Sequence, residues 1–355
     1  MAFIGGFGGA RCVGRRELRR AMCGAQPARM AAAPVGTTGK AAAAATVAET
    51  SVAGGDANEG LALFEYLKAK QAVVEAALAE SVASPGAETD RIYEAMRYSL
   101  MAGGKRIRPI LVLAACEMCG GQEEVAIPTA VAIEMIHTMS LIHDDLPSMD
   151  NDDLRRGMPT NHIMFGEDIA ILAGDALLAR SFEYVAKYTK NTSAERVLRV
   201  ISLLGESVGP EGLSGGQVMD LMCEGREDVT LEQLSWIHMK KTAALLRVSV
   251  AAGAILGGAD DADVQKVEEF ANKIGLAFQI ADDVLDVTQS SEQLGKTAGK
   301  DEAVNKATYP RLMGLEESRN EAQRLILEAK ACLEPFGPRS KTLLSLADFI
   351  ISRTN

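Results

Sequence analysis

The sequence predicts an all-α protein that folds as one large single-domain helical bundle. Aromatic residues are 5% of the 355 residues and Pro only 11, whereas β-sandwiches and barrels are richer in aromatic, β-branched and turn residues. Apolar residues recur at three- and four-residue intervals through most of the chain from Leu61 onward, which is typical of amphipathic helices. Loops are short and polar, and no fixed repeat or second domain boundary is visible. One bundle of about 300 residues is therefore expected.

Local sequence signals set the limits of the predicted helices. Ser84-Pro85-Gly86 ends the first helix and Gly103-Gly104 ends the second. Pro109 suits the first turn of the third helix, and Pro147 closes the fourth. The helices are expected at roughly 61–84, 89–101, 109–119, 125–145, 167–189, 193–206, 230–257, 260–287, 316–334 and 339–352.

The first 55 residues are predicted to be a disordered organelle transit peptide that precedes the folded domain at 56–355. Residues 1–50 hold seven Lys and Arg, two Glu and no Asp, and five Arg lie between Arg11 and Arg20. This acid-poor, Arg-rich composition is typical of transit peptides, although residues 1–50 contain no Ser. A disordered tail without a targeting role is the alternative. A secretory signal does not fit, because no apolar core of roughly 7–15 residues follows the basic start.

The remainder of the chain is strongly acidic. Residues 51–355 carry 30 basic and 46 acidic side chains, a net charge of −16. This charge argues against binding to nucleic acid or anionic membranes, but focused cations or bridging metal ions can still bind anions. The longest apolar stretch, Thr242–Ala259, is interrupted by Arg247 and rich in Ala and Gly. It predicts a core helix and not a transmembrane span.

Cysteine spacing gives only a weak signal. Cys116 and Cys119 have CxxC spacing, but no second CxxC or His pair lies nearby to complete a zinc site. The favoured interpretation is structural, with both residues near a helix end before Gly120-Gly121. Redox sensitivity is the alternative.

An aspartate cluster is the strongest feature of the sequence. Five Asp lie within ten positions, at Asp144, Asp145, Asp150, Asp152 and Asp153. Such carboxylates repel one another unless cations neutralise them. Oxygen ligands of this kind favour Mg²⁺ or Ca²⁺, and the spacing does not fit an EF-hand loop.

A second acidic cluster follows on a later helix. Asp282 and Asp286 are four residues apart, so both carboxylates project from one helix face. If the two clusters face each other across a cavity, they hold several Mg²⁺ ions. Since Mg²⁺ takes much of its coordination from water and substrate phosphates, the pattern indicates a diphosphate substrate.

Basic residues adjoin these clusters and the glycine turns. They occur in Gly103–Pro109, in the pairs Arg155-Arg156 and Lys240-Lys241, and at Lys296, Lys300 and Lys306. Each group alone is more often a solvated surface, but their shared position beside Gly turns and Asp clusters favours anion binding.

These motifs resemble the trans-polyprenyl diphosphate synthases over about residues 60–355, and among them most closely the plastid type of geranylgeranyl diphosphate synthase. The first Asp-rich motif corresponds to Asp144-Asp145-x4-Asp150 followed by Arg155-Arg156-Gly157, and the second to Gln279-x2-Asp282-Asp283-x2-Asp286. The remaining signatures are GGKRxRP from Gly103 to Pro109, the Lys241-Thr242 pair, and the GQxxDL stretch Gly216–Leu221. The resemblance implies the isoprenoid synthase fold with a central active-site cavity, and a polyprenyl synthase catalytic domain at 56–355.

The resemblance also implies roles for individual residues. Mg²⁺ would be held by Asp144, Asp150 and Asp282, with Asp145, Asp283 and Asp286 in support. Isopentenyl diphosphate would be bound by Lys105, Arg108, His137 and Arg156. The allylic diphosphate would be bound by Arg155, Lys241, Thr242, Gln279, Lys296 and Lys306. His137 lies seven residues before Asp144, so both occupy one face of a helix.

The implied activity is head-to-tail condensation of isopentenyl diphosphate with dimethylallyl, geranyl or farnesyl diphosphate. Met139 and Ser140, about one turn before Asp144, would set the product length. Because neither is aromatic, we expect a twenty-carbon product, with a farnesyl or geranyl diphosphate synthase as the alternative. The resemblance further implies a homodimer, a possible small-subunit partner, and a location in plastids or, alternatively, mitochondria.

Three other classes fit less well. A class I terpene cyclase normally lacks the second Asp-rich motif and the GGKRxRP signature. A di-iron carboxylate bundle would need a second Glu-x-x-His beside Glu134-x-x-His137. A noncatalytic regulatory subunit usually has degraded Asp motifs, whereas both are intact here.

Overall fold

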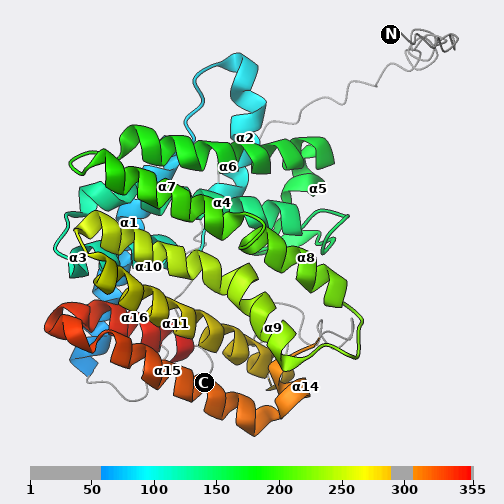
Figure 1. Ribbon diagram of the computed structural model, residues 1–355. Helices are drawn as coiled ribbons and strands as arrows, with labels where there is room; N and C mark the ends of the chain where they lie inside the picture. The colour runs from blue at the N-terminus through cyan, green and yellow to red at the C-terminus, as the bar shows by residue number, and fades with distance from the viewer. Residues whose placement is uncertain (1–56, 289–306, 353–355) are drawn as a thin grey trace, which may run out of the picture. The chain divides into compact units, whose positions relative to one another are not determined.

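The computed structural model describes residues 57–288 and 307–352. These residues are helical almost throughout (Figure 1), which confirms the all-α prediction. The α-helices are α1 (Ala57–Ser81), α2 (Asp90–Leu100), α3 (Ile107–Met118), α4 (Glu123–Asp144), α5 (Asn161–Phe165), α6 (Glu167–Tyr188), α7 (Ala194–Val208), α8 (Leu213–Cys223), α9 (Leu231–Ile237), α10 (Ala244–Gly257), α11 (Asp261–Thr288), α14 (Tyr309–Met313), α15 (Leu315–Cys332) and α16 (Lys341–Ser352). Short 3₁₀ segments η1 (Ala87–Thr89) and η3 (Glu334–Ser340), a π-helical turn η2 (His238–Ala243), and strands β1 (Leu154–Arg155) and β2 (Met158–Pro159) complete the described elements.

Helices α3, α4, α10 and α11 make up much of the interior. Helix α4 packs against α6 and α3, while α10 packs against α3, α11, α4 and α7. Helix α15 covers α11 (Figure 1). The helices that carry the two Asp-rich motifs are therefore joined through α10.

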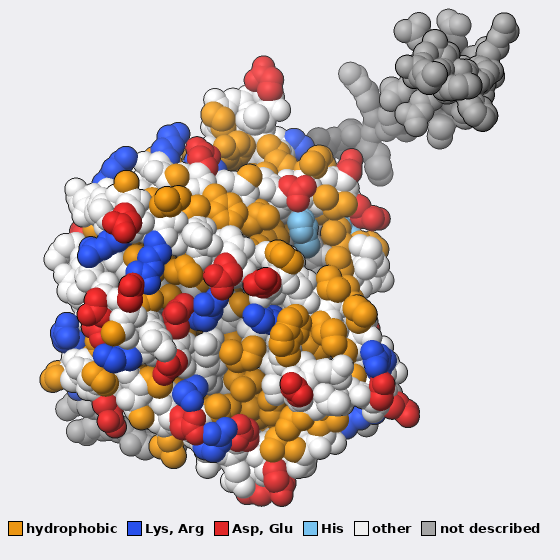
Figure 2. All heavy atoms as spheres, in the orientation of Figure 1, with side chains coloured by type: hydrophobic (Ala, Val, Ile, Leu, Met, Phe, Trp, Pro, Cys, Tyr) orange, Lys and Arg blue, Asp and Glu red, His pale blue; other side chains and the backbone are white. Residues whose placement is uncertain are grey.

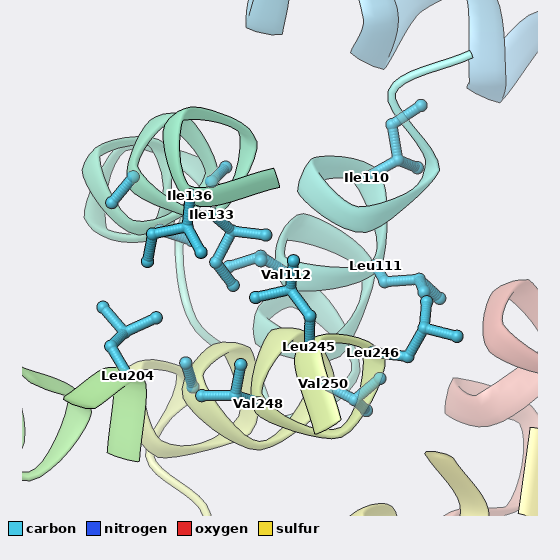
Figure 3. Packing of buried hydrophobic residues seen from close by; sticks show 14 of the residues in the cluster. Ile110, Leu111, Val112, Ile133, Ile136, Leu204, Leu245, Leu246, Val248 and Val250 are labelled. Carbon is cyan, nitrogen blue, oxygen red and sulfur yellow. The ribbon is translucent and has the colours of Figure 1, made fainter. Parts of the chain in front are cut away.

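The core between α3, α4 and α10 is closely packed. Val112 of α3, Ile133 and Ile136 of α4, and Leu245 and Val248 of α10 converge there (Figure 3). All five are almost completely buried. Each such side chain contributes roughly 1.5–3 kcal/mol relative to exposure, which fixes how these helices face one another.

Glycine allows the closest approach between α10 and α3. A Cβ on Gly253 would lie 2.2 Å from the carbonyl oxygen of Val112. Real side chains do not tolerate that separation, so a larger residue would force the two helices apart.

Helix α4 is apolar on nearly all sides. Among the described residues it is the one helix long and apolar enough to cross a membrane by length and composition, and 83% of that window is buried within the protein. A helix that is hydrophobic all round occupies the core of a large domain. The stretch Thr242–Ala259, singled out in the sequence, is likewise mostly buried in α10.

The structure contains several elements that periodicity did not predict. Helices α5, α8 and α14 and the β1–β2 hairpin are absent from the sequence prediction, and the expected helix 230–257 is interrupted by the π-helical turn. Helix α8 contains Gly215-Gly216, a poor intrinsic helix signal. A Cβ on Gly216 would lie 2.4 Å from the backbone nitrogen of Lys241. Tertiary packing against the π-helical turn therefore requires the glycine that weakened the local signal.

The CxxC pair lies at the end of α3, as its structural interpretation requires. Cys116 is buried and Cys119 half-buried. Burial raises the pKa of the Cys116 thiol to about 12 and that of Cys119 to about 11. Both thiols are therefore protonated and unreactive near neutral pH.

Candidate active site

The first Asp-rich motif begins where α4 ends. Asp144 is the last residue of α4, and the chain then folds back on it. The backbone N–H of Asp150 donates to the carbonyl of Asp144 over 2.9 Å, and that of Asp152 donates to the carbonyl of Asp145 over 3.2 Å. This local folding gathers the clustered carboxylates at one end of a buried helix.

The β1–β2 hairpin directs the side chains of two consecutive arginines, Arg155 and Arg156, to different partners. Arg156 and Gly157 form its turn, with φ of 53° and 75°. Positive φ at both central positions is the requirement of a type I′ hairpin turn. Arg155 makes a bidentate pair with Asp145, with nitrogen–oxygen distances of 2.6 to 2.9 Å. Arg156 instead donates to the carbonyl of Gly103, so the two side chains serve different parts of the site.

The Asp144 carboxyl is held in an electrostatically costly environment. Burial is the main cause that raises its pKa to about 6, and the charges of Asp150 and Asp145 add to it. Lys241 and Arg155 oppose the shift. A carboxylate in this position gains from any cation that approaches it.

A second group of side chains surrounds His137 of α4, and its positive charge comes from Arg108 of α3 and Arg156 of the hairpin turn. Burial, and after it the charges of Arg108, Arg156, Arg155 and Arg106, hold the pKa of His137 well below its usual range. His137 is therefore neutral near pH 7. Arg108 as a whole is half-buried, but its Nε atom is buried and has no hydrogen-bond partner. The structure thus brings Arg108, His137 and Arg156 together in an arrangement that favours an anion.

Arg106 has a structural task that the sequence did not reveal. Its side chain is fully buried and bonds Glu75, Glu134 and the carbonyl of Leu100 over 2.6 to 2.8 Å. Because Arg106 already pairs with Glu134, the Glu134-x-x-His137 resemblance to a di-iron ligand set has no support. No group of three or more His, Cys, Asp or Glu within the described part of the chain is arranged to hold a metal ion unaided.

The π-helical turn η2 carries the Lys241-Thr242 pair. Nζ of Lys241 donates to Asp220 of α8 over 2.6 Å, and Oγ1 of Thr242 donates to Oε1 of Gln279 over 3.2 Å. A π-helical turn accommodates one extra residue in a helix and is frequent at functional sites. Here it brings side chains of α8 and α11 against Lys241 and Thr242.

The three carboxylates of the second motif are not equivalent. All lie on α11 and all are partly exposed. Asp283 accepts the backbone N–H of Tyr309 over 2.9 Å and lies 3.3 Å from Nε2 of His238. These contacts direct Asp283 toward η2 and α14.

The other predicted residues are placed as follows. Met139 and Ser140 are buried on α4 one turn before Asp144. Lys105 is exposed, with Nζ 5.8 Å from the ring centroid of Phe349 in α16. Lys296 and Lys306 lie outside the described residues. His238 and Tyr309 were missed, because only the folded chain brings them beside the motifs. Asp220 belongs to the GQxxDL stretch, but its pairing with Lys241 was not predicted.

The fold and site define a class of protein. The buried helix α4 of this all-α bundle ends in carboxylates and carries His137, among arginines, two turns earlier, while a second acidic motif lies on α11. This arrangement is that of the isoprenoid synthase architecture. A family model described as polyprenyl synthetase matches residues 89–334. The chain therefore belongs to the polyprenyl synthetase family, and the family prediction is confirmed.

Similar proteins agree with this assignment. The chain is 58% identical to a chloroplastic geranylgeranyl pyrophosphate synthase of Catharanthus roseus, covering 75% of this chain and 74% of that protein. It is 54% identical to a chloroplastic heterodimeric geranylgeranyl pyrophosphate synthase large subunit 1 of Arabidopsis thaliana, covering 82% and 79%. The crystal structure of an FPP/GFPP synthase from Zymomonas mobilis matches with a TM-score of 0.73 at 37% identity, covering 83% of this chain and 99% of that one.

The raised pKa of Asp144 predicts a pH-dependent conflict between stability and activity. The folded-state pKa of about 6 exceeds the unfolded value of 3.8, so ionisation of this carboxyl costs folding free energy as pH rises. Asp144→Asn removes that cost. In EDTA, its Tm should exceed that of the wild type by an amount that grows from about pH 4 to about pH 7, while turnover is lost.

Thermal unfolding followed by circular dichroism checks this prediction. Asp153→Asn is the matched control, because it makes the same charge change at an exposed position of the same motif. Equal, pH-independent shifts in the two variants would contradict the prediction.

Proposed function

We propose that this chain joins isopentenyl diphosphate head-to-tail to an allylic diphosphate and releases diphosphate. The observation that carries the proposal is the pair of sites along α4. Arginines surround the neutral His137, and the buried carboxyl of Asp144 lies two turns later on α4, near Lys241. Two diphosphates fit these sites in different ways, one directly on cations and one through metal ions bound to carboxylates.

Mg²⁺ is the metal that the residues fit best. Asp144, Asp150 and Asp282 are the proposed ligands, and Asp145 and Asp286 support them. Bound Mg²⁺ supplies positive charge that stabilises the departing diphosphate. Mg²⁺ is normally bound through one or two carboxylates and keeps several waters and substrate oxygens, which fits the carboxylates gathered at the end of α4.

The side chains bind and orient the two substrates. Lys105, Arg108, His137 and Arg156 would hold isopentenyl diphosphate, and neutral His137 would donate one N–H to it. Arg155, Lys241 and Gln279 would contact the allylic diphosphate, with Thr242 near the reacting carbon. Lys296 and Lys306 are proposed for the same site from the sequence alone.

The reaction needs little covalent chemistry from the protein. The allylic carbon–oxygen bond breaks, and its electron pair leaves with the diphosphate. The double bond of isopentenyl diphosphate forms the new carbon–carbon bond, and the proton it loses passes to the released diphosphate. The protein therefore contributes mainly orientation, charge stabilisation and exclusion of water.

We propose geranylgeranyl diphosphate as the main product, supplied to carotenoids, chlorophyll side chains and other diterpenoids. Met139 and Ser140 support a twenty-carbon limit, because neither adds an aromatic ring below the Asp motif. A farnesyl or geranyl diphosphate synthase is the second candidate. The FPP/GFPP synthase among the similar structures indicates that product length varies within the family.

Product analysis tests the reaction. Residues 56–355 incubated with Mg²⁺, isopentenyl diphosphate and each allylic starter in turn should yield a product with four isoprene units, identified by mass. EDTA should abolish the product, and restored Mg²⁺ should recover it. A lack of product with every starter would refute the enzymatic function and favour a regulatory subunit. A fifteen-carbon end product would support the second candidate.

A single substitution tests the chain-length proposal. Met139→Tyr places a ring where Met139 is 5% exposed, so the product should shift from twenty toward fifteen carbons. Met139→Leu is the control, since it nearly conserves the side-chain volume and should leave product length unchanged. Unchanged chain length in Met139→Tyr would remove Met139 from this role.

We also propose a homodimer formed through α5, α6 and the hairpin. Ile163, Met164, Ile171 and Leu172 are 43–54% exposed, and Figure 2 shows hydrophobic side chains gathered over α6. Sedimentation equilibrium should give twice the chain mass, and Ile171→Lys with Leu172→Glu should give the monomer. A monomeric wild type would refute the homodimer and direct attention to a small-subunit partner, as the name of the Arabidopsis thaliana relative suggests.

The plastid is the proposed location. The chloroplastic names of several relatives and the Arg-rich composition of residues 1–55 support it, with the mitochondrion as the alternative. Imaging of residues 1–55 fused to a fluorescent protein would distinguish the two organelles.

A further inference from the structure

The second carboxylate of the second Asp-rich motif is engaged by the protein itself. Oδ2 of Asp283 accepts the backbone N–H of Tyr309 over 2.9 Å and lies 3.3 Å from Nε2 of His238. Because a carboxylate only accepts, Nε2 carries the hydrogen in this contact. Two donors from different elements thus converge on one oxygen.

Two further contacts close this arrangement. The rings of His238 and Tyr309 are stacked, with centroids 5.7 Å apart and an interplanar angle of 16°. The Tyr309 hydroxyl lies 2.6 Å from Oγ of Ser235 in α9. His238 is 7% and Tyr309 3% exposed. The cluster Ser235, His238, Asp283 and Tyr309, here called the clamp, therefore joins α9, η2, α11 and α14 in a largely buried environment.

The His238–Asp283 contact of the clamp lies one helical turn from a second contact between the same two elements. His238 and Thr242 are four residues apart in η2, and Asp283 and Gln279 are four residues apart on α11. His238 contacts Asp283 and Thr242 contacts Gln279. The π-helical turn is thus held against α11 at two successive points, with Lys241 between them.

We propose that Asp283 is a positioning residue and that His238 and Tyr309 are its partners. The clamp fixes η2 so that Lys241 and Thr242 face the allylic diphosphate, and it fixes the start of α14. Asp282 and Asp286 differ in this respect, since their proposed role is toward bound metal. The inference rests on the proposed prenyl transfer and gives Asp283 a task distinct from the metal-directed role proposed for Asp282 and Asp286.

Steady-state kinetics distinguish a positioning role of Asp283 from a role as a metal ligand. Asp283→Ala and His238→Ala should raise KM for the allylic diphosphate about tenfold, as expected for the loss of a hydrogen bond to a charged group. The Mg²⁺ concentration for half-maximal rate should stay within about twofold of the wild type. Asp283→Asn keeps an acceptor oxygen and should recover most of the loss. Asp282→Asn, the matched control on the same helix, should raise the Mg²⁺ requirement.

Trp236 provides a readout that does not need turnover. It is the one Trp of the chain and lies in α9 between Ser235 and the start of η2. Asp283→Ala and His238→Ala should make its fluorescence more accessible to acrylamide, whereas Asp282→Asn should not. If Asp283→Ala does not fold, His238→Ala alone provides this comparison, with Asp283→Asn as the variant expected to stay close to the wild type.

Two results would overturn the clamp. One is an Mg²⁺ requirement that rises in Asp283→Asn as much as in Asp282→Asn. The other is Asp283→Ala with wild-type allylic KM and wild-type Trp236 quenching. A wild-type chain without prenyl transfer would instead refute the proposed function, while the Trp236 measurement would still decide whether the clamp exists.

Discussion

The burial of α4 is the constraint on which the site depends. Its apolar surface packs against α3, α6 and α10, so the helix delivers Asp144 and Asp145 into surroundings that penalise charge. Nearby positive charges offset the cost of burying these carboxylates. Arg155 pairs with Asp145, Lys241 lies near Asp144, and the proposed Mg²⁺ would supply the remaining positive charge. Buried carboxylates that repel one another favour the binding of cations.

The same helix explains how an acidic protein binds anions. Two turns before Asp144, His137 is surrounded by arginines and is held neutral. The net charge of −16 over residues 51–355 is therefore a poor guide to the local field. The arginines beside His137 and the carboxylates at the end of α4 make up the two proposed anion sites, one built from cations and one that would act through bound metal ions. This difference suits two diphosphate substrates with different fates.

Side chains that are adjacent or equivalent in the sequence acquire different tasks in the fold. The hairpin turn sends Arg155 to Asp145 and Arg156 to the glycine turn before α3. Lys105, Arg106 and Arg108 are all basic residues of one short segment, and Arg106 pairs with Glu75 and Glu134 in a buried network. Local backbone geometry and burial decide these differences.

The sequence by itself determined the helical class, most helix limits and both Asp-rich motifs, because apolar periodicity and motif spacing are local properties. The family followed from the motifs. Only the tertiary structure decided that Asp283 faces His238 and Tyr309, that Lys241 pairs with Asp220, and that a π-helical turn interrupts the predicted helix 230–257. The Lys241–Asp220 contact joins residues 21 positions apart, and the His238–Asp283 contact joins residues 45 positions apart. Their physical origin is the packing of α8 and α11 against η2, which glycines at 216 and 275 permit and which no local pattern encodes.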